Sequence, residues 1–524
     1  MITAAPPPAP SPIGSRPTNH QPESLRRGIF FRPRIARIQV GLHIRVKPKT
    51  RDLSTQISAF EIGRPHADRP RLVLVLVWSR DEATRVGELI SPPVQAEPRS
   101  YTVGRADRAD KKGREALMLC QLRPHTLRTT GPFRATHISR RQLLLSIDAH
   151  GSASIERIAR ARLLVNGRPV NRAELSPGDL IEVERRFTLL VSTRPQSWPD
   201  EASVGDPFTF GHADRDGLVG ESPVAWELRR QIAFFAPRSS HVLVHGPSGS
   251  GKELVVLALH RGSERGAAPL VSRNASTIPE SLLDAELFGN LKNFPNPGMP
   301  DRPGLFGQAN GSSLFLDEIG ELPYAMQAHL LRVMDLGEYQ RLGEARTRRT
   351  DARVLGATNR ELTSLKHDVL ARFFHRIEVE GLNNRREDIP LLARHLLRNI
   401  GRDNPDLCAR FFEDTEPRLD AALMRGLLRH RYRTHTRELN ELLWSSAGAS
   451  SGQILLPQGP LDQALTSHRQ DPVKAVDIHT ISRQEVEHAL AAAGGVQERA
   501  WRALGLRNRY QLRRLIKKFA INSS

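Results

Sequence analysis

Hydrophobic and polar positions along the 524-residue chain are spaced differently in successive regions. Residues 1–68 are rich in proline, arginine and serine and show little periodicity, so we expect a largely disordered segment there. Within it, the alternation of residues 35–46 predicts one strand. Residues 71–193 hold short apolar stretches separated by turn signals such as Asn166-Gly167 and Pro177-Gly178. Because no helical period competes with these strands, the region is predicted to be a β-sandwich.

A second change of pattern follows residues 194–217, which have the composition of a linker. Apolar strands and amphipathic helices then alternate over residues 218–385, which predicts a parallel, doubly wound sheet. Residues 386–451 show the i, i+3, i+4 spacing of helices. After a looser stretch at residues 452–476, residues 477–524 are predicted to form a small all-α block. The fold class is therefore multidomain.

Composition narrows the class of protein. The formal net charge of +20 favours an anionic partner such as nucleic acid, although an arginine-rich proteome would raise the charge of any of its proteins. Cys120 and Cys408 are far apart, which fits neither a disulfide framework nor a cysteine zinc site and is typical of a reducing compartment. The stretch "MITAAPPPAPSP" lacks the apolar core of a signal peptide, and the apolar run at residues 72–78 is too short to span a bilayer. We therefore expect a cytoplasmic protein with no membrane partner.

The strongest local signal is "HGPSGSGKE", between a predicted buried strand and a predicted helix. Its glycines let backbone N–H groups approach phosphates, the helix N-terminus adds its dipole, and Lys252 would reach the β- and γ-phosphates. Glu253 stands where the general motif has a serine or threonine for magnesium, so the ion must rely on another carboxylate and on water. The predicted ATP-binding residues of this loop are Gly246, Pro247, Ser248, Gly249, Ser250, Gly251, Lys252 and Glu253.

A pair of carboxylates ends the hydrophobic strand in "SSLFLDEIGELP". Asp317 is predicted to hold magnesium, directly or through water, and Glu318 to polarise the attacking water. An acidic pair after a strand is usually a solvated strand end. Its place in the same sheet as a phosphate-binding loop favours catalysis instead. ATP and Mg²⁺ are therefore the expected cofactors, and ATP hydrolysis is the expected reaction.

Several stretches together carry a specific resemblance: "VLVHGPSGSGKELVVLALH", "ESLLDAELFGN", "RPGLFGQANGSSLFLDEIGELP", "MQAHLLRVMDLGEYQRLG", "ARVLGATNREL" and "RREDIPLLARHLL". They resemble the central domain of bacterial enhancer-binding proteins, the AAA+ ATPase activators of sigma-54 RNA polymerase. The resemblance covers residues 218–451 and implies an α/β AAA+ core over residues 218–385 with a helical lid over residues 386–451. A loop that ends in Gly-Lys-Glu is itself usual in this family.

The resemblance implies further roles. Asn274 matches the asparagine that senses nucleotide and holds the catalytic glutamate back, and Thr358 and Asn359 match the sensor I segment. Arg437 matches the sensor II arginine that reaches phosphate from the lid, although "RYRTH" replaces the usual Trp-Pro-Gly turn before it. Arg376 matches the arginine finger that enters the neighbouring subunit's site. A finger of this kind implies a homo-oligomer, which by resemblance is a hexamer.

In this family the segment after "ELFG" carries a GAFTGA loop tip that grips the sigma factor. The loop keeps its length here but not its chemistry, because its two prolines fix φ and remove N–H donors. Two interpretations compete: an altered but working tip anchored by Phe294, or a loop that has lost contact with sigma-54. The six tip positions are Asn293, Phe294, Pro295, Asn296, Pro297 and Gly298.

The N-terminal sandwich resembles a forkhead-associated (FHA) domain in "YTVGRAD", "HISRRQLLL", "LLVNGRPV" and "LSPGDLIEV". Such domains bind phosphothreonine, and Arg105, Ser139 and Arg140 would supply charge-assisted contacts to the phosphate. Gln142 replaces the usual histidine, the usual Asn-Gly-Thr is absent, and a long insert at residues 110–134 separates two of the motifs. A sandwich kept for packing or dimerisation is the alternative to a phosphothreonine-binding protein.

The C-terminal block reads as three helices with a glycine turn at Gly505, and it resembles a Fis-type helix-turn-helix. Its last helix is basic, which favours contact with the major groove or with phosphates of an enhancer-like upstream site on DNA. The predicted DNA-binding residues are Arg509, Tyr510, Gln511, Arg513, Arg514 and Lys517.

Two functions from different classes fit these features. One is an ATP-hydrolysing, DNA-bound activator whose ring remodels a sigma-54 RNA polymerase complex, with the FHA-like region as sensor. The other is a DNA-binding regulator that uses ATP binding as an assembly switch and does not contact sigma-54. The carboxylate pair Asp317 and Glu318 favours the enzyme, and the altered loop tip favours the switch.

Overall fold

The computed structural model of the chain describes residues 70–93, 98–124, 126–148, 151–195 and 208–462, together with scattered positions between Arg483 and Phe519. Residues 1–64 separate from residues 65–524 as a unit of their own, and the fold below belongs to the second unit. The expected disordered segment and its candidate strand lie outside the described residues. No helix in the described part of the chain has the length and apolar character needed to cross a bilayer.

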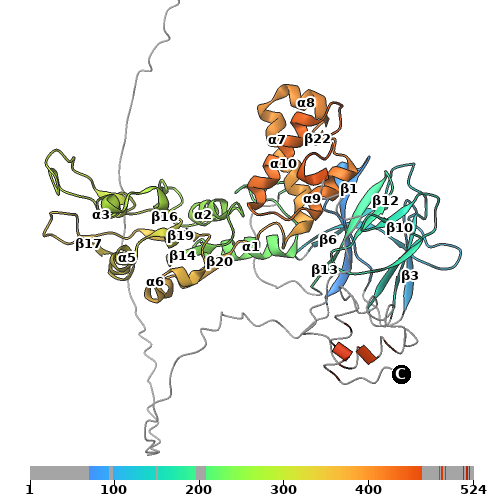
Figure 1. The fold of residues 1–524 in the computed structure, drawn as a ribbon, viewed down its shortest axis with the longest axis horizontal. Helices are drawn as coiled ribbons and strands as arrows, with labels where there is room; N and C mark the ends of the chain where they lie inside the picture. Colours follow the sequence, from blue (N-terminus) through green and yellow to red (C-terminus); the bar gives the residue numbers. More distant parts are fainter. Residues whose placement is uncertain are drawn as a thin grey trace, which may run out of the picture. The chain divides into compact units, whose positions relative to one another are not determined.

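Two sheets enclose one apolar core in the N-terminal region (Figure 1). The larger has the order β10-β9-β12-β13-β1-β2-β5-β6, and the smaller has the order β11-β8-β7-β3-β4. The strands of the larger sheet are β1 (Arg71–Ser79), β2 (Leu89–Ile90), β5 (Leu119–Arg123), β6 (Thr126–Gly131), β9 (Leu163–Val165), β10 (Arg168–Val170), β12 (Leu180–Val183) and β13 (Phe187–Arg194). Those of the smaller sheet are β3 (Arg99–Val103), β4 (Ala116–Leu117), β7 (Leu143–Ile147), β8 (Ala153–Arg157) and β11 (Arg172–Leu175).

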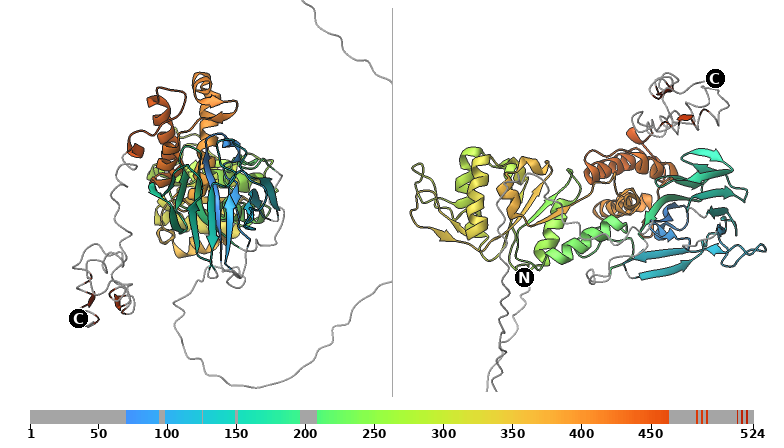
Figure 2. Two further views of the ribbon diagram at one scale, coloured as in Figure 1. Left: turned by 90° about the vertical axis from the view of Figure 1, so that its right-hand side faces the viewer. Right: turned by 90° about the horizontal axis from the view of Figure 1, so that it is seen from below.

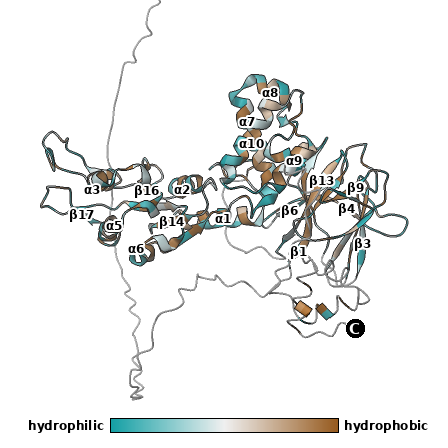
Figure 3. Ribbon diagram, viewed as in Figure 1, coloured by the Kyte–Doolittle hydropathy of each residue, from teal (hydrophilic) through white to brown (hydrophobic). Residues whose placement is uncertain are grey.

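Strand β1 is apolar at consecutive positions because both of its faces are covered. Leu74 and Leu76 belong to the core between the two sheets. Val73 and Val75 point the other way and join a second core, which is shared with the lid helices. A strand at the surface of an ordinary sandwich alternates apolar and polar residues, so an unbroken apolar run indicates cover on both sides. Apolar residues accordingly gather on β1, β13 and the lid helix α9 (Ala421–Arg429) (Figure 3).

The insert at residues 110–134 builds three of these strands, β4, β5 and β6. Strand β5 pairs antiparallel with β2 on one side and with β6 on the other, so the insert widens the larger sheet. Cys120 and Leu122 of β5 belong to the core shared with the lid. The insert therefore reaches the ATPase-like region instead of forming a free loop.

A parallel five-stranded sheet forms the α/β region, in the order β15-β16-β19-β14-β20, and it confirms the predicted parallel sheet. Because the strands are parallel, their carboxyl ends share one edge, where a doubly wound sheet binds its ligands. The strands are β14 (Val242–His245), β15 (Val271–Asn274), β16 (Ser313–Asp317), β19 (Arg353–Thr358) and β20 (His375–Glu378).

Helices cover both faces of this sheet (Figure 2). Phe315 of β16 packs in the core that includes α1 and α2, whereas its neighbours Leu314 and Leu316 pack in the core that includes α3 to α6. The helices are α1 (Pro223–Phe235), α2 (Lys252–Arg261), α3 (Leu283–Phe288), α4 (Gly304–Gln308), α5 (Tyr324–Leu336) and α6 (His367–Arg372). A short hairpin, β17 (Glu338–Tyr339) with β18 (Arg348–Arg349), follows α5.

A helical lid follows the sheet and packs against the outer face of β1, since Val75, Leu391 and Leu427 belong to one core. The lid consists of α7 (Ile389–Asp403), α8 (Pro405–Phe411), α9 (Ala421–Arg429) and α10 (His435–Ala449), with a small hairpin of β21 (Phe412–Glu413) and β22 (Glu416–Pro417). Short 3₁₀ helices are η1 (Ala83–Arg85), η2 (Ala275–Thr277), η3 (Glu280–Leu282), η4 (Ile319–Glu321), η5 (Leu362–Ser364) and η6 (Arg386–Asp388).

Few positions of the C-terminal block are described. Val486 and Leu490 are helical and buried, as are Leu512 and Leu515. The six residues predicted to contact DNA lie outside the described residues, so the helix-turn-helix stays a prediction.

Candidate functional site

The predicted phosphate-binding loop connects β14 to α2, and its glycines are required by close packing. Gly246 and Gly249 have φ angles of +148° and +73°. A Cβ on Gly246 would lie 2.4 Å from the carbonyl oxygen of Val379, and one on Gly249 would lie 2.1 Å from that of Thr434. The loop is therefore pressed between the end of β20 and the lid, in conformations that only glycine adopts without strain.

Lys252 begins α2, and its ammonium group turns back into the loop. Its Nζ donates to the carbonyl oxygens of Gly246 at 3.0 Å and Pro247 at 3.1 Å. Burial lowers the pKa of Lys252, while Glu318 and Asp317 act in the opposite direction. The hydroxyl oxygen of Ser250 is buried beside this lysine without a hydrogen-bond partner in the described chain. A buried ammonium and an unpaired hydroxyl at glycine-rich backbone suit a phosphate group.

Asp317 and Glu318 stand at the carboxyl end of β16, on the same edge of the sheet. Glu318 has a φ of +51°, a left-handed conformation that is uncommon for residues other than glycine and is frequent at functional sites. Its Oε2 accepts from the backbone N–H of Asn359 at 3.2 Å. Asp317 Oδ2 accepts from Asn274 Nδ2 at 3.1 Å. The two carboxylates thus have different partners.

The contact of Asn274 differs from the one implied by the family resemblance. That resemblance has this asparagine hold the catalytic glutamate, whereas here it donates to Asp317. The register explains the difference, because Asn274 of β15 lies directly opposite Asp317 of β16 in the parallel ladder. Glu318 lies one residue further and turns toward the end of β19, where Asn359 holds it.

The lid meets the loop through Arg437 and the residues before it. Arg437 NH1 donates to Ser248 Oγ at 3.2 Å, and the backbone N–H of Thr436 donates to the Gly249 carbonyl at 3.1 Å. His435 adopts a φ of +48°, and its Nδ1 accepts from the backbone N–H of Leu382 at 3.2 Å. The altered turn therefore still brings the predicted sensor II arginine against the loop.

Arg376 lies on β20, the strand next to β14. Its NH2 donates to the carbonyl oxygen of Leu370 at 3.0 Å. Phe374, two residues before Arg376, is 78% exposed. A large exposed apolar side chain beside an arginine fits a surface that another protein covers.

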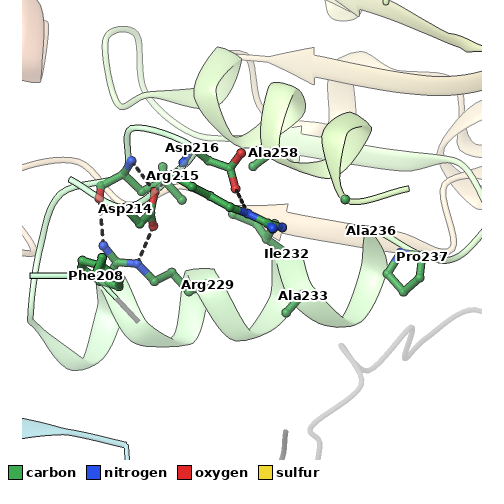
Figure 4. A pocket seen from close by; sticks show the side chains of 12 residues that line it. Phe208, Asp214, Arg215, Asp216, Arg229, Ile232, Ala233, Ala236, Pro237 and Ala258 are labelled. Carbon is green, nitrogen blue, oxygen red and sulfur yellow. Dashed lines mark hydrogen bonds and ion pairs between the residues drawn. The ribbon is translucent and has the colours of Figure 1, made fainter. Parts of the chain in front are cut away.

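Two cavities flank α1, and only one of them touches the loop. The larger, of about 240 Å³, lies beside α1 and the end of α2, and its charged groups pair with one another, Asp214 with Arg229 and Asp216 with Arg215 (Figure 4). The smaller, of about 80 Å³, contacts Ser250 and Gly251 of the loop. The smaller cavity therefore adjoins the predicted phosphate-binding residues, whereas the larger one does not.

Sequence reasoning missed the lining of this smaller cavity. Val219 and Leu254 supply apolar surface, and Arg385 and Leu392 come from the start of the lid. Arg385 NH2 donates to the carbonyl oxygen of Ser250 at 3.1 Å. These residues act through packing and backbone contacts, which leave no motif of their own. The stretch "RREDIPLLARHLL" was the available signal, since it holds Arg385 and Leu392.

The predicted loop tip at residues 293–298 is closed by its own hydrogen bonds. Asn293 N–H donates to the Met299 carbonyl at 2.8 Å, and Asn293 Oδ1 accepts from Gly298 N–H at 3.0 Å. The ring of Phe294 is 41% exposed and lies over Gly343, where an added Cβ would be 2.7 Å from it. The aromatic ring therefore rests against the connection between β17 and β18.

The predicted phosphothreonine residues lie on two loops that touch. Arg105 N–H donates to the Ser139 carbonyl at 3.1 Å, and its Nε donates to the Ile138 carbonyl at 3.3 Å. Arg140 is exposed at the same place. Gln142, in place of the usual histidine, is fully buried and accepts from Ser139 N–H at 3.3 Å. The substituted residue thus supports the Ser139 loop.

Comparison with known proteins matches the same part of the chain. Residues 218–383 match the family described as the Sigma-54 interaction domain. The chain is 35% identical over 313 residues to the transcriptional regulatory protein ZraR of Escherichia coli O157:H7, covering 58% of this chain and 69% of ZraR. It is 42% identical over 196 residues to the anaerobic nitric oxide reductase transcription regulator NorR of Enterobacter sp. (strain 638), covering 36% of this chain and 39% of NorR. The solved structure of NtrX from Brucella abortus in complex with ATP aligns with 59% of this chain and 70% of NtrX, at 24% identity and a TM-score of 0.41.

Proposed function

Since the chain belongs to the sigma-54-interacting transcriptional regulators, we propose that it is an ATP-hydrolysing, DNA-binding regulator that remodels an RNA polymerase complex. The observation that supports hydrolysis best is the convergence of charged groups on one loop. Lys252 Nζ bonds two carbonyl oxygens of the loop, Arg437 of the lid bonds Ser248 of the loop, and Asp317 and Glu318 stand at the carboxyl end of β16 in the same sheet. A cation, two carboxylates and a lid arginine around a glycine loop are the parts that phosphoryl transfer needs.

Each residue has a role in the proposed reaction. Lys252 would exchange its bonds to loop carbonyls for bonds to phosphate oxygens, and Arg437 would bind phosphate from the lid. Glu318 would orient the attacking water and take its proton, as a general base does. Magnesium bound with ATP neutralises charge on the phosphates, and we assign Asp317, whose carboxylate suits this ion, to hold it.

We also propose that the working form is a ring, by family resemblance a hexamer. Arg376 NH2 donates to the carbonyl oxygen of Leu370, outside the loop, and an arginine finger acts on the site of a neighbour. DNA binding is assigned to residues 477–524 by resemblance to a helix-turn-helix.

Arg105, Ser139 and Arg140 would bind a phosphothreonine protein, since the loops that carry them are held together by hydrogen bonds.

A second function is favoured by the loop tip. Pro295 and Pro297 restrict the backbone, and Phe294 is engaged with Gly343. A stiff, internally bonded tip suits a regulator that uses ATP binding for assembly and does not grip sigma-54. This alternative needs ATP binding but no hydrolysis.

Steady-state ATP turnover by the full chain separates the two functions. Glu318→Ala should still bind ATP but turn it over at least ~100-fold more slowly, the usual loss for a general base. Lys252→Ala should lose ATP binding, because its ammonium is the main positive charge in the loop. Turnover by Glu318→Ala equal to that of the wild type would remove Glu318 from catalysis. A wild type that binds ATP without turnover would favour the switch.

A further inference from the structure

One short segment joins the parallel sheet to the lid, and its side chains reach different parts of the molecule. Arg385 donates to the Ser250 carbonyl of the phosphate-binding loop, and Arg386 Nε donates to the Leu428 carbonyl of α9 at 2.8 Å. Glu387 and Asp388 complete the segment. Arg385, which is buried, therefore links the segment directly to the loop.

The β-sandwich holds this segment directly through Arg194, the last residue of β13. Arg194 NH1 and NH2 lie 3.1 and 2.8 Å from the two carboxylate oxygens of Glu387. The side chains are only 3% and 11% exposed. Burial raises the pKa of the Glu387 carboxyl, and Arg194 opposes that effect. Removing one partner of such a pair leaves a buried charge without compensation, which costs more than a surface ion pair does.

A second ionic contact comes from the insert, through Arg123 at the end of β5. Its NH2 and Nε donate to the carboxylate of Glu221 at 2.5 and 3.0 Å, and its guanidinium lies 4.2 Å from the ring centre of Phe208. Glu221 precedes Ser222, the N-cap of α1. Asp388 accepts from the backbone N–H groups of both at 2.9 and 3.0 Å. Arg123 is thus connected to Asp388 of the joining segment through Glu221.

An apolar core between the sandwich and the lid holds the two regions together beside these ionic contacts. Val75 and Leu190 of the larger sheet share a core with Leu391 and Leu427 of the lid, and Trp78 Nε1 donates to the Leu419 carbonyl at 2.8 Å. A sensor on a flexible tether has no such continuous core. One buried and one partly buried ionic contact beside this core fix orientation, which apolar packing alone does not do.

We propose that the β-sandwich is a positioning element of the ATP site, in which Arg194 and Arg123 fix the segment of Glu387 and Asp388 and so hold Arg385 against the phosphate-binding loop. The inference rests on the proposed ATP site, and it assigns to the N-terminal region a direct part in nucleotide binding. Arg194 and Arg123 are positioning residues, since neither touches the loop.

The test compares ATP dependence with stability in the full-length protein. Arg194→Gln should raise the KM for ATP at least ~10-fold with a smaller change in kcat, because misplaced binding groups weaken ground-state contacts. A fluorescent ATP analogue should dissociate correspondingly faster. Arg194→Lys keeps the charge but loses the bidentate contact, so its KM for ATP should lie between those of the wild type and Arg194→Gln. As a control, Arg128→Gln changes an exposed position on the hairpin of β5 and β6, which also carries Arg123. Its KM for ATP and its rate of analogue dissociation should equal those of the wild type.

A purely structural role gives a different pattern. If Arg194→Gln lowers the melting temperature while its KM and analogue dissociation stay within about twofold of the wild type, the proposal is wrong. If that variant does not fold, Arg123→Gln, whose side chain is 19% exposed, must show the same rise in KM, and an unchanged KM there overturns the proposal. A wild type without ATP turnover contradicts the proposed hydrolysis, whereas analogue dissociation still decides the positioning role.

Discussion

Gly249 of the phosphate-binding loop packs directly against the lid. A Cβ there would lie 2.1 Å from the Thr434 carbonyl oxygen, and the φ of +73° is strained for any other residue. We expect Gly249→Ala to push the lid off the loop, at a stability cost of about 1–3 kcal/mol, and to lower ATP turnover at least ~10-fold. Thermal melting and steady-state turnover measure the two effects.

A glycine on the neighbouring lid helix provides the control. Gly448 lies in α10 with no atom near an added Cβ and no left-handed φ. Gly448→Ala should therefore stabilise the protein by up to about 1 kcal/mol and leave turnover unchanged. Full activity of Gly249→Ala, alongside a silent Gly448→Ala, would show that the close contact with the lid is not needed for turnover.

The sequence predicts the residues with proposed roles in ATP binding and hydrolysis better than the residues that act through packing or backbone contacts. Lys252, Asp317 and Arg437 stand in motifs whose spacing expresses their role, and the structure brings all three to one loop. Arg385 bonds a backbone carbonyl, and Arg194 pairs with a carboxylate that is distant in sequence. Neither contact constrains a local pattern, so no motif predicts them.

Among the elements, the loop tip at residues 293–298 lacks the GAFTGA residues that the family resemblance implies there. Its internal hydrogen bonds and prolines leave little freedom to reshape around a partner, so any contact must be preformed with Phe294 as anchor. We predict weak or no binding of sigma-54 in the ATP transition-state form. Replacing the six residues with the family's GAFTGA tip should create or strengthen binding, as measured by capture of sigma-54 with a transition-state analogue.

The same assay identifies the opposite case. Tight capture of sigma-54 by the native tip, lost in Phe294→Ala, would make the native tip a working grip of unusual chemistry. Tyr324→Ala, which alters an exposed aromatic residue outside the tip, should leave capture unchanged and serves as control.

Sequence patterns predicted whether a segment forms a helix or a strand, but they did not predict which residues it packs against. The alternation of strands and helices predicted the parallel sheet, because a crossover helix must return each strand to the same edge. The register that sets Asn274 opposite Asp317 is a property of the assembled ladder, so the hydrogen bond between these two residues could not be predicted from the motifs. The double burial of β1 was visible only as an unbroken apolar run.

On the scale of the whole molecule, residues 477–524 are proposed to act separately from the ATPase. Removing them should abolish site-specific DNA binding and leave ATP turnover intact, as measured by binding to a set of DNA sequences and by turnover of the same preparation. Within them, Arg513→Ala should cost ~1–3 kcal/mol and relax specificity at one position if Arg513 reads a base. A uniform loss across sequences with a smaller salt slope would assign Arg513 to phosphate instead.

We propose that this chain hydrolyses ATP at a site shared between neighbouring subunits. Mixing Arg376→Ala subunits with Lys252→Ala subunits tests this proposal, because each variant alone should be inactive. ATP turnover should recover in the mixture, since a wild-type loop on one subunit can meet a wild-type Arg376 on the next. No recovery at any mixing ratio, with both variants folded and able to assemble, would contradict a finger that acts across the subunit interface.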